Sequence, residues 1–269
     1  MRLFELEALG GPWGRRLARR RAGLDALPWS SASALAGGAS AGELETARWV
    51  WTQSAFSEYA SAAAFASIAS CLLSAGAPID LVAAAGDFVA DEIIHTELCS
   101  RVAMSLGGAV VLEVDLERLV RPPLAEAPLL RAAELVVRTC CVGEALTLPI
   151  LKTAKARSPS ELIRAVIGRI ARDESGHAEL GSWFLDWAAP RLSDGDRAHL
   201  GRVAGASLRA FAPVFAGPCS PGGELGVLDC RAYDAAFAQA VARRVIAPLH
   251  VRGILIPEED LSALPPPER

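Results

Sequence analysis

The side chains best suited to chemistry lie in two copies of the pattern Asp-Glu-x-x-His. Residues 91–95 read Asp-Glu-Ile-Ile-His, and residues 173–177 read Asp-Glu-Ser-Gly-His. Residues three apart on a helix share a face, so the Glu and His of each copy can reach one metal ion together. A single Glu-x-x-His is usually an exposed pair on a helix. Two copies in one chain predict a metal site built from Glu92, His95, Glu174 and His177.

Glu58 and Glu144 are the candidates for the remaining ligands. Each lies at nearly the same depth along the helices as the motif that follows it. This depth is obtained by counting residues from the turns at Gly76 and Ser158 at about 1.5 Å per residue. Small or apolar residues lie one turn away on either side: Ser54, Ala55, Ser61 and Ala62, and Cys140, Cys141, Thr147 and Leu148. A buried carboxylate in such surroundings is costly unless it is neutralised, and metal ions would neutralise it. The alternative is that both glutamates face solvent.

Four long helical patterns would position these residues. They cover residues 41–74, 78–107, 128–157 and 158–190. Tight turns join the first two and the last two, which predicts two antiparallel hairpins, and Ser158 and Glu161 are expected to form a capping box at the start of the fourth helix. Residues 109–127 are long enough to run the length of a bundle at about 3.3 Å each. Pro149 is expected to kink the third helix beside the site.

The flanking regions carry no catalytic spacing. Residues 1–42 are expected to form an irregular arm, with a basic cluster at Arg15, Arg16, Arg19, Arg20 and Arg21. A solvated arm or short helix is the preferred interpretation of that cluster, and a surface for an acidic partner or phosphate is the alternative. Residues 191–269 are expected to form further helices, over about 194–215 and 231–254, which pack on the bundle, cover the site or make a subunit contact.

Composition limits the class of protein. The 269 residues are 52% hydrophobic with a net charge of −4, which excludes a disordered chain and gives no reason to expect nucleic acid or membrane partners. The start of the chain lacks the pattern of a signal peptide, and the apolar stretches are broken by charges, so a cytoplasmic location is predicted. The six cysteines form no C-x-x-C pair and are expected to be buried thiols.

The doubled pattern Glu58…Glu92-x-x-His95 and Glu144…Glu174-x-x-His177 resembles the ferritin-like di-iron carboxylate superfamily. The resemblance covers about residues 41–189, a little over half of the chain. It implies an all-α, ferritin-like four-helix bundle over residues 43–190, with additional C-terminal helices. It also implies two iron ions, one held by each set of Glu, Glu and His, with Glu92 and Glu174 as candidate bridges.

The resemblance also assigns secondary roles. Asp91 and Asp173 match the acidic residue that hydrogen-bonds a ligand histidine in di-iron oxygenases and ribonucleotide reductase small subunits. Cys99, one turn after His95, and Thr147 are candidates to line a substrate pocket. Ile170 replaces the third histidine of the N-oxygenase branch, and the C-terminal C-x-x-C domain of rubrerythrins is absent.

The function implied is that of an oxidoreductase, an oxygenase or oxidase that uses O2 and a small, hydrophobic organic substrate. An electron-donor protein and a homodimer are further expectations, and manganese or a mixed iron–manganese pair is an alternative to iron. The alternative functions are a ferroxidase or iron-handling protein, a rubrerythrin-like scavenger of peroxide, and a tRNA-modifying hydroxylase. A helical scaffold with a degenerate site is the remaining alternative.

Overall fold

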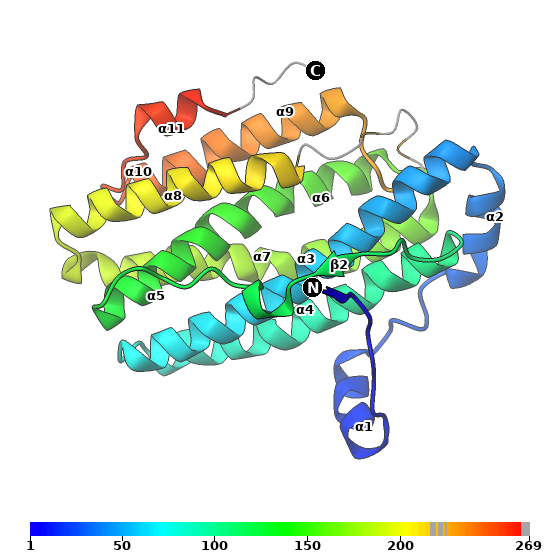
Figure 1. The fold of residues 1–269 in the computed structure, drawn as a ribbon, viewed down its shortest axis with the longest axis horizontal. Coiled ribbons are helices and arrows are strands. Elements are labelled where there is room, and N and C mark those ends of the chain that lie inside the picture. Colours follow the sequence, from blue (N-terminus) through cyan, green and yellow to red (C-terminus); the bar gives the residue numbers. More distant parts are fainter. Residues whose placement is uncertain (216–218, 220–222, 224, 265–269) are drawn as a thin grey trace.

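The computed structural model describes residues 1–269 except 216–218, 220–222, 224 and 265–269. Within that part of the chain the fold is all-α apart from one two-stranded sheet (Figure 1). Four long helical segments lie along one another, and the C-terminal helices cover one side of them. The all-α class predicted from the sequence is therefore confirmed.

The first hairpin is formed by α3 (Ala41–Ser74) and α4 (Ile79–Ser105), which pack along their length. A capping box starts α3, because the Ser40 hydroxyl accepts from the Glu43 amide while the Glu43 carboxylate accepts from the Ser40 amide. The turn that follows needs Gly76, whose φ of 63° lies in the left-handed region. The predicted bounds of both helices are confirmed to within two residues.

The chain then returns along the first hairpin through residues 106–127 (Figure 1). On the way, β2 (Glu113–Val114) pairs antiparallel with β1 (Arg2–Leu3), and the short helix η2 (Leu116–Arg118) follows. The long connection therefore runs back along the helices and brings the third helical segment into the same direction as α4.

The third segment consists of α5 (Pro128–Val136), the π-helical η3 (Val137–Glu144) and α6 (Ala145–Arg157). The helix continues through Pro149, where a kink was expected, and the departure from α-helical geometry instead precedes Glu144. A π-helical stretch widens the backbone and is frequent at functional sites. The distortion thus falls directly at a predicted ligand.

The second hairpin is completed by α7 (Glu161–Ala188). Its cap is Ser160, whose hydroxyl accepts from the Ile163 amide at 3.3 Å, so the predicted capping box at Ser158 is wrong by two residues. Ser158 instead accepts from the Ser160 amide within the turn. The helix still begins within a few residues of the predicted start.

The C-terminal region packs on the third segment and on α7. Its elements are η4 (Ala189–Arg191), α8 (Asp194–Phe215), α9 (Cys230–Ala240), the π-helical η5 (Val241–Ile246), α10 (Ala247–His250) and α11 (Glu258–Ser262). The chain before α11 crosses α8 in backbone contact, since a Cβ on Gly201 would lie 1.9 Å from the Leu255 carbonyl oxygen. Arg209 and Asp260 form an ion pair at this crossing.

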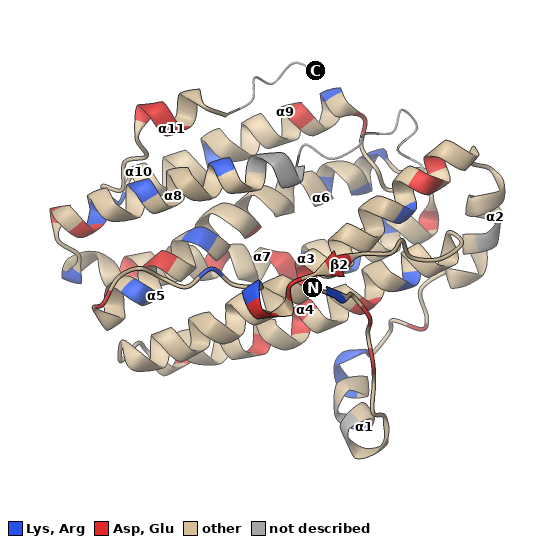
Figure 2. Ribbon diagram, in the orientation of Figure 1, with Lys and Arg blue, Asp and Glu red and all other residues tan. Residues whose placement is uncertain are grey.

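The N-terminal residues contain α1 (Gly11–Arg20), η1 (Trp29–Ser31) and α2 (Ala32–Gly37), so they are less irregular than expected. Figure 2 shows basic residues on α1, which stands apart from the main body of helices. Two members of the predicted basic cluster pair with α4. Arg20 binds Asp87 and lies 3.5 Å from Asp91, and the Arg21 Nε donates to Glu97 at 2.7 Å.

The expectation that all six cysteines are thiols is wrong. Cys219 and Cys230 form a disulfide with a Cα–Cα distance of 5.2 Å, in which Cys230 begins α9. They are 11 residues apart in sequence. Cys71, Cys99, Cys140 and Cys141 are free.

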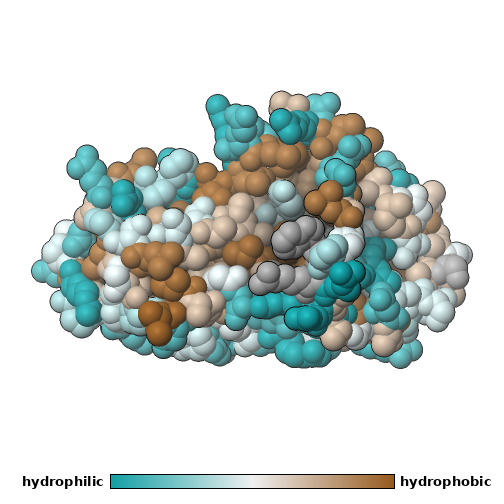
Figure 3. Space-filling view, turned by 90° about the horizontal axis from the view of Figure 1, so that it is seen from below, coloured by the Kyte–Doolittle hydropathy of each residue, from teal (hydrophilic) through white to brown (hydrophobic). Residues whose placement is uncertain are grey.

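One described helix, α3, is long and apolar enough to cross a membrane by length and composition alone. It packs along α4 and contributes buried residues to the core, as the central helices of soluble proteins also do. Figure 3 shows apolar side chains in separate patches among hydrophilic ones on the face seen from below.

Candidate metal centre

Six acidic and histidine side chains from the four long segments converge in the interior. They form two overlapping groups, in each of which the potential ligand atoms lie within 4.8 Å of one another. The first group contains Glu58, Glu92, His95 and Glu174, and the second contains Glu92, Glu144, Glu174 and His177. Glu92 and Glu174 belong to both groups, as a pair of bridging carboxylates would.

The first group gathers around the Nδ1 atom of His95. This atom lies 3.1 Å from Glu174 Oε1, 3.6 Å from Glu92 Oε2 and 3.8 Å from Glu58 Oε2. The His95 side chain is fully buried. One histidine nitrogen therefore faces carboxylates from three different helices.

The second group has the same construction around His177. Its Nδ1 atom lies 2.9 Å from Glu92 Oε1 and 3.0 Å from Glu174 Oε2. Glu144 joins this group from the last turn of the π-helical η3. Only 5% of Glu144 is exposed, and Glu92, Glu174 and His177 are fully buried. The second group is therefore closed to bulk solvent.

Each histidine has its outer nitrogen turned towards the aspartate of the opposite motif. Asp173 Oδ2 lies 3.3 Å from His95 Nε2, and Asp91 Oδ2 lies 3.8 Å from His177 Nε2. Asp173 is itself held by the Arg169 Nε at 2.8 Å. A carboxylate behind a ligand histidine fixes the ring and raises its basicity. The pairing crosses between α4 and α7, which the sequence pattern does not reveal.

Burial of so many charges changes their proton affinities. Burial, with repulsion from neighbouring carboxylates, raises the pKa values of Glu58 and Glu144 well above their ordinary value. Burial alone would lower the pKa of His177, but the carboxylates of Asp91, Glu174 and Glu92 raise it to about 12. Burial would raise the pKa of Glu174, whereas its two histidine neighbours hold it below its ordinary value. Without metal, the centre thus retains protons.

Several buried atoms of the centre have no hydrogen-bond partner among the described residues. They are both carboxylate oxygens of Glu92, Glu174 Oε1, His95 Nδ1 and His177 Nε2. An unsatisfied buried polar atom costs about 1–3 kcal/mol, so a concentration of them needs an explanation. Metal ions satisfy such atoms by coordination. The residues present therefore fit a metal-binding centre.

Apolar groups enclose the centre. The rings of Phe65 and Phe88 lie 5.0 Å and 4.3 Å from the His177 ring, measured between centroids. Burial and the nearby Glu58 carboxylate raise the pKa of the Cys99 thiol well above its ordinary value, so this thiol is neutral and close to the acidic groups. Such a shell limits access of water to the centre.

A close approach of two helices positions Glu144. A Cβ on Gly181 would lie 2.7 Å from the Cys141 sulfur and 3.2 Å from the Cys140 Cβ, so α7 packs directly against the π-helical stretch. On the other side, a Cβ on Gly143 would lie 3.2 Å from the Phe211 ring of α8. Because Gly181 and Gly143 have no side chain, α7 and α8 can both approach η3 closely.

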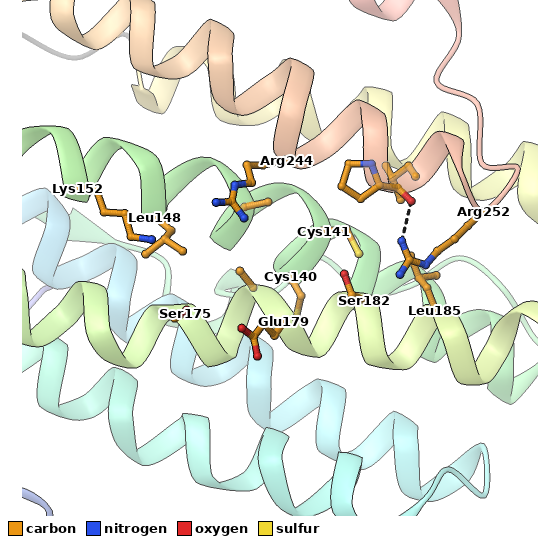
Figure 4. A pocket seen from close by; sticks show the side chains of 14 residues that line it. Cys140, Cys141, Leu148, Lys152, Ser175, Glu179, Ser182, Leu185, Arg244 and Arg252 are labelled. Carbon is orange, nitrogen blue, oxygen red and sulfur yellow. Dashed lines mark hydrogen bonds between the residues drawn. The ribbon is translucent and has the colours of Figure 1, made fainter.

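A pocket of about 350 Å³ lies between the third segment, α7 and the C-terminal helices (Figure 4). Cys140 and Cys141 line it, whereas Cys99 and Thr147, the residues suggested by the family resemblance, are not among the lining residues. The Thr147 hydroxyl donates to the Gly143 carbonyl. The sequence pattern does not predict this pocket, because it forms where the tail, which carries no spacing that signals a site, meets the third segment and α7.

A second pairing of an acid with a histidine, between buried Glu134 and half-buried His199, has a different character. The Glu134 carboxylate accepts the backbone amides of Leu124 and Ala125 at 2.7 Å and 2.9 Å, and lies 2.7 Å from His199 Nε2. This pair ties the long connection to α5 and α8. Because the Glu134 carboxylate is supplied with donors, it needs no metal.

Comparison with protein-family models, with curated proteins and with solved structures finds no match to the chain. The chemistry assigned to the centre is therefore carried by its geometry: two overlapping groups of buried carboxylates and histidines that could hold metal ions.

Proposed function

We propose that the chain is a ferritin-like, non-haem di-iron protein that activates O2 to oxidise or oxygenate an organic substrate. The observation that carries this proposal is the sharing of Glu92 and Glu174 between two buried ligand groups, each completed by one further glutamate and one histidine. Two adjacent ions bridged by carboxylates would satisfy both groups at once. A single ion would leave Glu58 or Glu144 as an uncompensated buried acid.

The donor set suits iron. Imidazole nitrogens and carboxylate oxygens bind Fe, and the same set accepts Mn, so a manganese or mixed pair is the alternative occupancy. Four glutamates balance the charge of two divalent ions without any lysine or arginine. When bound, such ions supply redox chemistry with O2, which no side chain of the centre supplies alone.

The chain's own residues would hold and protect that centre. Asp91 and Asp173 orient the two histidines, while Phe65 and Phe88 keep water away from His177. The raised pKa values of Glu58 and Glu144 mean that protons leave these groups as metal enters.

Two observations favour an organic substrate over the alternatives. A pocket of about 350 Å³ shares the third segment and α7 with the centre, and a protein whose substrate is iron itself does not need such a pocket. Arg20 and Arg21 are engaged with acids of α4, which weakens the case for tRNA as substrate, since that case depended on the basic cluster. Peroxide scavenging is separated from O2 activation by experiment.

The proposal is tested by anaerobic loading with Fe(II), followed by mixing with O2. The wild type is expected to bind two irons per chain and to show a rapid, O2-dependent absorbance change. Glu58→Gln and Glu144→Gln each alter one ligand group, so each is expected to bind one iron and to lose the change. Glu134→Gln is the matched control, because Glu134 is equally buried but lies outside both groups.

Other outcomes would redirect or remove the proposal. Turnover of iron in large excess into a ferric mineral would replace oxygenation with iron handling. A reaction with hydrogen peroxide but not with O2 would favour a scavenger. Absence of metal binding in the wild type, or equal binding in all three variants, would refute the assignment of the ligands.

A further inference from the structure

The pocket of about 350 Å³ has walls from three parts of the chain. The third segment, α7 and the η5–α10 region enclose it (Figure 4). Ala145 and Ser175, which line it, directly follow the proposed ligands Glu144 and Glu174 in the sequence. Repulsion from the acids of the centre contributes to the raised pKa of Cys140, another lining residue. The pocket and the centre therefore share the third segment and α7, although none of the six proposed ligands lines the pocket.

Its rim is basic. Lys152 on α6, Arg244 on η5 and Arg252 after α10 line the pocket, whereas Glu179 on α7 is the single acid among the lining residues. In Figure 4, Arg244 extends from η5 towards α6. Within the described part of the chain, neither Lys152 nor Arg244 has an acidic partner within 4.0 Å. The pocket thus carries uncompensated positive charge.

Arg252, unlike Lys152 and Arg244, is paired with an acid. Its guanidinium is held by Asp186 at 2.8 Å and donates to the Pro248 carbonyl at 2.8 Å. It is therefore a fixed part of the wall, with its charge balanced by Asp186. Lys152 and Arg244 remain as the two cations available to a ligand.

The remainder of the lining is apolar or neutral. Leu148, Leu185 and Leu249 contribute aliphatic surface. Cys140 and Cys141 are thiols rather than thiolates, since burial raises both pKa values, that of Cys141 to about 12. They add no negative charge. The pocket thus combines cations with a lining of aliphatic and neutral polar side chains, and its size is at the lower end for small-molecule sites.

We infer that this pocket binds a small organic anion, a carboxylate with an apolar body, through Lys152 and Arg244. The anion would lie between the two cations, and its body would lie against Leu148 and its aliphatic neighbours. The inference rests on the proposed function only in making this anion the substrate. Binding itself does not need the metal.

Octanoate is a suitable probe, with 1-octanol and octylammonium as neutral and cationic molecules of equal chain length. Affinities are measured by calorimetry on the metal-free full-length protein at low salt. Octanoate is expected to bind about tenfold more tightly than 1-octanol, since charge-assisted hydrogen bonds are the stronger kind, and octylammonium more weakly than either. The preference for octanoate should decrease with added salt.

The double variant Lys152→Gln, Arg244→Gln is expected to lose the tenfold preference while keeping its affinity for 1-octanol. Both side chains are exposed, so folding should not suffer. Arg243→Gln is the matched control, because Arg243 is the exposed neighbour of Arg244 on η5 and does not line the pocket. It should bind octanoate as the wild type does.

Octanoate binding no tighter than 1-octanol, or a preference that survives in the double variant, would overturn the inference. Lack of binding by all three probes would do the same. These results are separable from failure of the metal proposal, which is judged by iron stoichiometry. A chain that binds octanoate but no iron would keep the pocket and lose the di-iron function.

Discussion

Replacing Glu144 by Gln should have opposite consequences for stability with and without metal. In the metal-free protein this carboxyl is buried against the Glu174 and Glu92 carboxylates, which raise its pKa together with burial. Its charged form is therefore disfavoured in the fold. The neutral isostere Gln removes that penalty, so we expect the melting temperature of the metal-free variant at pH 8 to be equal to or above that of the wild type.

In the presence of metal the sign reverses. A ligand at about 100 times its Kd adds about 2.7 kcal/mol to stability. At roughly 2–4 °C per kcal/mol for a chain of this size class, the wild type should gain about 5–10 °C on metal addition. Glu144→Gln weakens one of the two ligand groups and should lose about half or more of that gain, measured by scanning calorimetry under anaerobic conditions with Fe(II).

Glu134→Gln is the control for this test, because Glu134 is a buried acid with a structural role only. The Glu134 carboxylate accepts two backbone amides and faces His199, and weakening such bonds costs about 1–3 kcal/mol. Its melting temperature should fall by the same amount with and without metal. If Glu144→Gln behaved like Glu134→Gln, with an intact gain from metal, Glu144 would be a structural residue and the reasoning about the second group would be wrong.

Two further perturbations test the centre and the tail. The pKa values of Glu58, Glu144 and His177 are all raised in the fold, so the native protein binds more protons than the unfolded chain. The stability of the metal-free protein should therefore fall as the pH rises from about 5 to 9. A melting temperature that rises over this range would contradict the burial of these groups. Gly201→Ala would place a Cβ 1.9 Å from the Leu255 carbonyl and should cost about 1–3 kcal/mol, with faster proteolysis near residue 255. Gly195→Ala, whose Cβ would approach no atom closer than 3.7 Å, is its control, and equal digestion of the two variants would show that the crossing is loose.

The helices and the convergence of the six predicted side chains were predictable because their signals are local. Gly76 marks a turn with a left-handed residue, and the doubled Glu-x-x-His spacing places side chains on one face whatever surrounds them. Glu58 and Glu144 followed from helical rise together with the small or apolar residues one turn away from each. All six side chains lie together in the two groups, although their coordination of metal is still a prediction.

Features that depend on contacts between distant segments were not predictable. The π-helical stretch before Glu144 is packed between α7 and α8, where Gly181 and Phe211 meet it. The Cys219–Cys230 disulfide and the pocket wall at Arg244 depend on how the tail folds back. The helix continues as α6 through Pro149, and the π-helical stretch lies upstream at Val137–Glu144, where α7 and α8 pack on it.

The crosswise pairing of aspartates and histidines has a consequence for the order in which a newly made chain becomes competent. The hairpin of α3 and α4 can form early, because its contacts are local, but His95 must wait for Asp173, 78 residues further along. An emerging chain would offer incoming cations only half a set of ligands, from which they would dissociate readily. Under the proposed function, the choice of ion would therefore be made after synthesis of α7, by the finished protein rather than by whichever cation arrives first.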